Sequence, residues 1–256
     1  MHALRVLGWG WVFHAKMMTR SAFDGLLAVL WPLFFATVAF FMFRNGGNPE
    51  LLVYAALGAA VMGVWTATSV PASSALQRAR WHGVLELLVA TPVHFSLVLL
   101  PVTIATSAIG LYCLAATILW GKFAFGIDLP MEHPFAFALA VPATVISVGM
   151  LGFLLAVAFV RFRRSWAMGA VLEYPVWLIC GFLVPLSLLP DWVRPISWAL
   201  GPTWGMNAIR QASMGGTPLP DVAICFALGL GYVAAGVLML NSVLRSAREH
   251  ATLALT

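Results

Sequence analysis

The sequence predicts an all-α integral membrane protein with six transmembrane helices. Of its 256 residues, 62% are hydrophobic and only 9% are Asp, Glu, Lys or Arg, whereas ordinary soluble domains contain about 25% charged residues. The mean hydropathy is +0.94. The 14 basic and 9 acidic residues are too few to form the polar surface of a soluble fold of this length. This composition excludes a soluble enzyme, a nucleic-acid-binding domain and a disordered protein.

The first element, residues 1–21, is predicted to be an amphipathic helix at the membrane surface. Arg5, Trp9 and Lys16 share one face of a helical wheel. A helix with a basic polar face lies in the membrane interface rather than across the bilayer. This helix either anchors the topology or acts as a lever between a cytoplasmic partner and the first span.

Six long runs that are almost free of charged residues predict the transmembrane helices. A helix needs about 20 apolar residues to cross about 30 Å of hydrocarbon, and each run is long enough. The predicted spans are approximately 22–43, 51–76, 95–120, 135–160, 166–189 and 222–244. We expect the whole chain, residues 1–256, to form a single membrane domain.

A seventh apolar run, 195–209, is too short to cross the membrane. It holds 15 residues between Arg194 and Arg210, and Gly201-Pro202 interrupts it. A run of this length favours short re-entrant helices on the external side, between the fifth and sixth spans.

The distribution of Lys and Arg predicts that both termini are cytoplasmic. Ten of these residues lie in the N-terminal segment, the 77–94 loop, the 161–165 loop and the C-terminal tail, and four lie in the opposite segments. Because cytoplasmic loops carry the excess of basic residues, the set of ten marks the cytoplasmic side. Both termini share one side only if the number of spans is even.

The sequence has no motif for ATP hydrolysis, metal binding or nucleophilic catalysis. The patterns G-x-x-x-x-G-K-[ST], H-E-x-x-H and G-x-S-x-G are all absent. The three cysteines, Cys113, Cys180 and Cys225, are too far apart for a metal-binding motif. We therefore expect no catalytic residue, no metal site and no cofactor bound by this chain, so energy for any work must come from elsewhere.

Glu173 is the acidic residue that lies deepest within a predicted span. It follows Trp166 by seven residues, which places it about 10 Å into the membrane by helix rise. A carboxylate at this depth must face protein or a water-filled cavity. It either makes a structural inter-helix hydrogen bond or contributes to a subunit contact or to the translocation path, for which Tyr174 and Trp177 are further candidates.

The loop between the second and third spans carries the most informative pattern. From Arg80 to Pro92 it reads RWHGVLELLVATP. As a helix this segment is amphipathic, with a leucine-rich face opposite Arg78 and Glu86. A short helix parallel to the membrane, with its charged side toward the cytoplasm, is suited to docking a soluble partner. An ordinary turn between two spans is the alternative.

This loop resembles the signature loop of type-2 ATP-binding-cassette (ABC) exporter permeases. The matching pattern is Arg-x-x-Gly-Val-Leu-Glu-Leu-Leu-x-x-Thr-Pro. A second resemblance covers 185–192 and 201–210, which are similar to that family's stretch between spans five and six. The length, the six spans and the cytoplasmic termini also agree, so that the resemblance covers essentially the whole chain.

The resemblance implies that the loop is a coupling helix, set into a groove on a separate ATPase. The residues to which it assigns this role are Arg78, Arg80, Trp81, Gly83, Glu86, Thr91 and Pro92. The family often has an acidic residue shortly before the glycine, whereas this chain has Arg-Trp-His there. Its charge pattern toward the ATPase therefore differs from that of the family.

The resemblance also implies the assembly and its location. The partners are a P-loop ATPase subunit in two copies, which binds ATP and Mg, and a second permease subunit that is identical or paralogous. The complex would lie in the bacterial cytoplasmic (inner) membrane, in contact with membrane lipid and a hydrophobic substrate, and no nucleic acid is expected.

The function implied is ATP-driven export of a hydrophobic or amphipathic small molecule, such as a drug, an antibiotic or a lipid-like compound. The pathway has almost no fixed charge, and the loop resembles those of drug-resistance and nodulation-factor permeases. Export of a lipid-linked polysaccharide is one alternative. Another is an ion-coupled carrier acting alone, for which Glu173 would be essential, and a third is a membrane enzyme or assembly scaffold.

Overall fold

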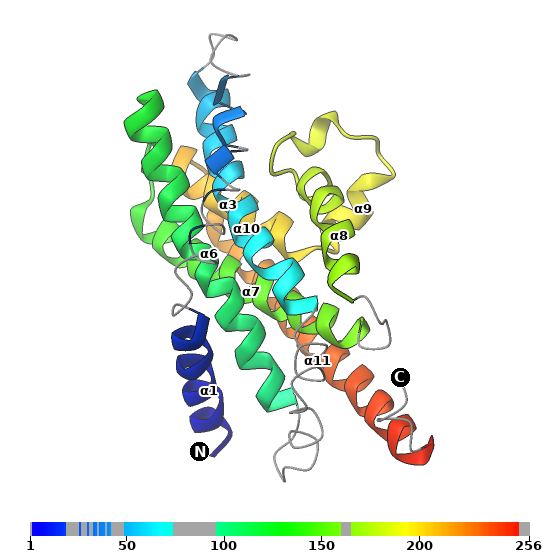
Figure 1. Ribbon diagram of the computed structural model, residues 1–256. Coiled ribbons are helices and arrows are strands. Elements are labelled where there is room, and N and C mark those ends of the chain that lie inside the picture. Colours follow the sequence, from blue (N-terminus) through cyan, green and yellow to red (C-terminus); the bar gives the residue numbers. More distant parts are fainter. Residues whose placement is uncertain are drawn as a thin grey trace.

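The computed structural model is a bundle of helices in every part of the chain that it describes (Figure 1). The structure describes residues 2–18, 49–73, 96–159 and 165–250, together with a few helical positions between 26 and 41. No strand occurs among these residues. The predicted all-α fold class is thus confirmed for the part of the chain that can be seen.

Four helices are long and apolar enough to cross a membrane, judged by length and composition. They are α3 (Pro49–Ser73), α6 (Ser96–Phe125), α7 (Pro134–Ala158) and α11 (Pro218–His250). They overlap the predicted spans 51–76, 95–120, 135–160 and 222–244. Proline begins α7, where the missing N–H costs no hydrogen bond.

The predicted span 166–189 is wrong in its extent. In the described residues the corresponding helix, α8, covers Ser165–Ile179, and 15 residues rise only about 22 Å. The helix ends in a Schellman motif, in which Phe182 N bonds to Trp177 O and Gly181 N bonds to Leu178 O, each at 3.1 Å. Gly181 adopts φ +73°, a left-handed conformation that suits glycine.

The predicted span 22–43 lies mostly outside the described residues. The positions that can be seen there, among them Ala36 and Phe40, are helical, and both of these side chains are fully buried. The number of spans therefore stays a prediction.

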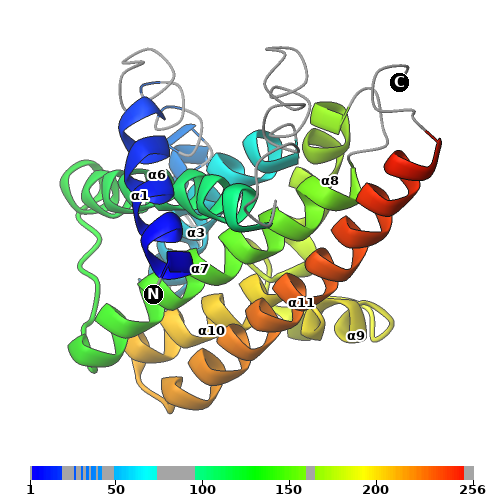
Figure 2. The ribbon, with the colours of Figure 1, turned by 90° about the horizontal axis from the view of Figure 1, so that it is seen from below.

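Helix α1 (His2–Met18) occupies most of the segment predicted as an interfacial helix. It packs against α6, as Figures 1 and 2 show. A Cβ added at Gly10 would lie 3.2 Å from Pro101 Cβ, so that the two helices approach closely at this point. Trp9 and Phe13 remain exposed. The location of α1 in a membrane interface stays a prediction.

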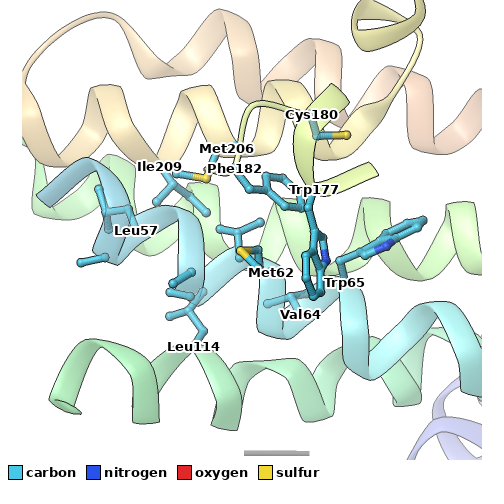
Figure 3. Packing of buried hydrophobic residues seen from close by; sticks show 14 of the residues in the cluster. Leu57, Met62, Val64, Trp65, Leu114, Trp177, Cys180, Phe182, Met206 and Ile209 are labelled. Carbon is cyan, nitrogen blue, oxygen red and sulfur yellow. The ribbon is translucent and has the colours of Figure 1, made fainter. Parts of the chain in front are cut away.

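The core of the bundle forms around α3, which packs against α6, α7 and α8. The apolar stretch of α3 is 72% buried within the bundle, against 17% for that of α11. Small residues alternate with large ones in this helix, so that Leu57, Met62 and Trp65 fit between the neighbouring helices (Figure 3).

Between α8 and α11 lie a 3-10 turn, η1 (Leu186–Leu188), and two short helices, α9 (Val193–Trp198) and α10 (Gly201–Met214). Two short helices were expected in this region. Helix α10 packs against both α7 and α11, and Figure 2 shows the three helices side by side.

Candidate functional site

Helices α9 and α10 form one segment, residues 193–214, and they meet at a tip, Ala199–Gly201. At the tip, Gly201 lies against Ser147 of α7. Ser147 is 13 residues from the start of α7, which corresponds to about 20 Å of helix rise. At the other end of α10, His133 N bonds to Ala212 O at 3.0 Å, next to the start of α7. Helix α10 therefore runs antiparallel to α7, from the interior of the bundle back to one end.

A buried arginine joins α10 to the rest of the bundle. Arg210 is 8% exposed. Its Nη1 donates to Gly181 O and its Nη2 to Phe182 O, both at 2.8 Å, and Nη2 lies 3.4 Å from Tyr54 O. Its Cζ lies 3.2 Å from the centroid of the Tyr54 ring, which is a cation–π contact. Three separate segments therefore meet at one guanidinium.

The partners of Arg210 are all neutral. Two ion pairs, Lys122–Asp128 and Arg194–Asp191, join exposed side chains and do not involve Arg210. Because a guanidinium stays protonated in proteins, Arg210 carries a positive charge that only carbonyl oxygens and an aromatic face compensate. The carbonyls of Gly181 and Phe182 follow the C-terminus of α8, where the helix dipole is negative.

Close backbone packing brings the end of α8 to this arginine. A Cβ added at Gly58 of α3 would collide with the carbonyl oxygen of Phe182 and would lie 3.2 Å from Nη2 of Arg210. The hydroxyl of Tyr54 also donates to Gly181 O, at 3.1 Å. The contact between α3 and residues 181–182 therefore requires glycine at position 58.

The predicted path residues on α8 have different surroundings. Glu173 is half-buried and accepts a hydrogen bond from the side chain of Thr66 on α3. Trp177 is 5% exposed and packs in the core with Trp65, as Figure 3 shows. Tyr174 is 59% exposed and meets the Trp177 ring edge-on at 5.0 Å between centroids. A common role for these three residues in a path stays a prediction.

A family model described as "ABC-2 type transporter" matches residues 9–214, from α1 to the end of α10. The chain belongs to the ABC-2 type transporter family. The resemblance of the chain to type-2 ABC permeases is thereby confirmed. The chain is a multi-pass membrane protein and a permease component of an ABC transporter, a family that works with an ATPase subunit. No curated protein matches the chain.

The predicted ATPase-coupling residues of this permease lie outside the residues that the structure describes. Arg78, Arg80, Trp81, Gly83, Glu86, Thr91 and Pro92 all fall between Ser73, where α3 ends, and Ser96, where α6 begins. Helices α3 and α6 pack against each other. The coupling segment therefore connects two neighbouring helices of the core, and its own conformation stays a prediction.

Sequence reasoning missed the residues that fasten α10 to α3 and to the end of α8. Arg210 was noted only as the end of an apolar run, and Tyr54 and Gly58 were not singled out. A usable signal was present, because Arg210 is a cation at the end of an amphipathic helix and has no acidic residue within four positions.

Proposed function

We propose that this permease is the transmembrane subunit of an ATP-driven exporter that moves a hydrophobic or amphipathic small molecule out of the cell. The observation that carries the proposal is the lack of charge inside the bundle. Among the described residues, Arg210 is the one charged side chain that is buried. Backbone carbonyls already accept its hydrogen bonds. A path of this kind offers few partners to an ionic or strongly polar solute.

Export by this chain requires a separate motor, which we place on the cytoplasmic side. Two copies of a P-loop ATPase bind ATP and Mg and dock on the 77–92 segments. Closure of the ATPases moves these segments, and the movement passes to α3 and α6, which the segment connects. Because α3 also packs against α7 and α8, a shift of α3 changes the arrangement of the whole bundle.

A second permease subunit, identical or paralogous, completes the pathway in this proposal. The support is the outward apolar face of α8, where Val171 is 66%, Tyr174 59% and Leu178 48% exposed. Such a face requires lipid or protein to cover it. The complex is placed in the bacterial cytoplasmic membrane, with both termini of the permease in the cytoplasm.

The test is co-purification followed by a transport assay. The chain is expressed with its genomic neighbours, purified in mild detergent and assayed for a bound ATPase with stimulated hydrolysis. Transport of a fluorescent amphipathic dye is then measured in proteoliposomes. We expect Glu86→Arg to uncouple hydrolysis from transport. Asp128→Arg is the matched control, because Asp128 is 89% exposed on the loop after α6. Normal transport by Glu86→Arg would remove the docking argument.

The same assay distinguishes the alternatives. A permease that purifies alone and moves the dye down a proton gradient would favour an ion-coupled carrier, with Glu173 as its proton-binding group. Glu173 is half-buried against Thr66, and this position supports the ion-coupled carrier as a second candidate. An ATPase-bound complex that moves only a lipid-linked polysaccharide would replace the small-molecule substrate.

A further inference from the structure

We propose that Arg210 is the latch of an external gate. It holds the segment after α8 closed against α3 and α10, and its release opens that end of the permease during transport. The closed state is inferred from the contacts of Arg210 alone. The opening step rests on the function proposed above.

The latch joins the segment after α8 to α10. The main packing partners of α8 among the described elements are α3 and the six-residue helix α9. The segment from Cys180 to Trp192 contains only a single 3-10 turn. Arg210 reaches from α10 across to this segment and takes two of its carbonyl oxygens. Without Arg210, residues 180–192 lose their charged attachment to α10.

The chemistry of the contact favours reversible closure. Burying a cation without an anion is costly, and the Nε of Arg210 has no hydrogen-bond partner among the described residues. In the closed state carbonyl dipoles and the Tyr54 ring compensate this cost. In an open state the guanidinium would instead recover its hydration from the external water. Two arrangements of similar free energy are what a gate requires.

The position of Tyr54 connects the latch to the motor. Tyr54 lies on α3, whose far end, Ser73, leads into the coupling segment. A movement of α3 therefore shifts both the ring beneath the guanidinium and Gly58, against which Phe182 packs. These contacts are short and directional, so a small displacement of α3 weakens all of them together.

The accessibility of a native cysteine, Cys180, shows whether the latch is closed or open. Cys180 directly precedes Gly181, is 1% exposed and makes a side-chain hydrogen bond with Thr203 of α10. It is a free thiol. Cys113 and Cys225 are also buried and form no disulfide, but they lie on α6 and α11. Opening of the gate should expose Cys180 selectively.

The first experiment uses the full-length permease, purified without ATPase, and a soluble maleimide. Labelling of each cysteine is followed by mass spectrometry. We expect Arg210→Met to accelerate labelling of Cys180 about tenfold, which corresponds to about 1.4 kcal/mol of closing free energy, while Cys113 and Cys225 stay protected. Arg194→Gln removes an exposed cation from α9 and should leave all three rates unchanged.

A second variant keeps the test decisive if Arg210→Met fails to fold, which labelling of all three cysteines would reveal. Tyr54→Leu removes the ring and the hydroxyl but leaves the cation, and should also accelerate labelling of Cys180 selectively. Folded variants in which Cys180 stays as protected as in the wild type would overturn the latch.

The second experiment adds the ATPase and tests the opening step. In the wild-type complex ATP should accelerate labelling of Cys180, and in Arg210→Met ATP should produce little further change. A complex that transports without any change at Cys180 would make Arg210 a static clamp and overturn the gate. If no ATPase binds the permease, the proposed function fails, whereas the nucleotide-free labelling of Arg210→Met still supports or overturns the closed latch.

Discussion

The hydroxyl of Tyr232 on α11 accepts a 2.7 Å hydrogen bond from the backbone N–H of Gly201, the first residue of α10. The same hydroxyl donates to Ala199 O, also at 2.7 Å. A helix start leaves four N–H groups without intrahelical partners, and Leu200, at the N-cap position of α10, has no side chain that can bind one. Tyr232 therefore caps α10 from another helix and holds the tip between α9 and α10.

Tyr232→Phe should loosen this tip without changing its packing. Both hydrogen bonds are lost, and at about 0.5–1.5 kcal/mol each the free energy of unfolding should fall by about 1–3 kcal/mol. Amide hydrogen exchange of Leu200 and Gly201 should accelerate. Tyr112→Phe is the control, because Tyr112 is 64% exposed on α6. Unchanged exchange at the tip in Tyr232→Phe would show that the hydroxyl does not hold it.

Gly58→Ala should be strongly destabilising. The new Cβ would collide with the Phe182 carbonyl, and a backbone oxygen cannot move aside as the end of a flexible side chain can. Separating α3 from residues 181–182 would also weaken the contacts of Arg210. We expect a loss of about 3 kcal/mol or more, measured by thermal unfolding in detergent.

The matched control for this substitution is Gly231→Ala. A Cβ at Gly231 of α11 would meet nothing within 4 Å, so alanine should leave the stability unchanged or raise it by up to about 1 kcal/mol through helix propensity. Equal melting temperatures for the two variants would contradict the close approach of α3 to Phe182.

Hydropathy predicted the long helices because a bilayer imposes the same length on each apolar run. It could not predict where α8 ends, since the apolar run continues to Leu189 while the chain turns at Gly181. The turn depends on a left-handed backbone conformation, which carries no hydropathy signal. A glycine after an apolar run can mark the end of a helix. Glycine is also frequent inside transmembrane helices, however, so it did not decide where α8 ends.

The latch was beyond sequence reasoning for a different reason. Tyr54, Gly181 and Arg210 come from segments that are far apart in the chain, and the first and the last are 156 positions apart. Their meeting depends on how three helices pack, which no local pattern encodes. The two short helices α9 and α10 were predictable because their length and their Gly-Pro interruption are local properties.

Acidification should weaken the attachment of α1 to α6. His14 is half-buried, and this burial lowers its pKa below the usual value of about 6.5. Its Nδ1 has no hydrogen-bond partner among the described residues. The docked helix therefore favours neutral imidazole, whereas an undocked His14 takes up a proton near its ordinary pKa. Docking is strongest above pH 6.5 and weakens as the pH falls through that value.

The measurement for this effect is tryptophan fluorescence of α1, or its amide hydrogen exchange, between pH 8 and about pH 5. His14→Leu should remove the pH dependence, and His133→Leu, an exposed position before α7, should keep it. A pH profile in His14→Leu identical to that of the wild type would assign the effect to another group.

Glu173→Gln tests whether the charge of this residue matters or only its hydrogen bond. Glutamine has almost the same shape, and its amide oxygen can still accept the hydroxyl of Thr66. Thr66→Val does the reverse, because it removes the donor and leaves the carboxylate. We expect Glu173→Gln to weaken dye transport or subunit assembly, measured in proteoliposomes and by size-exclusion chromatography. The opposite outcome is that Glu173→Gln matches the wild type in both assays and only Thr66→Val lowers stability. The carboxylate would then be a structural hydrogen-bond acceptor on α8, with no part in the translocation path.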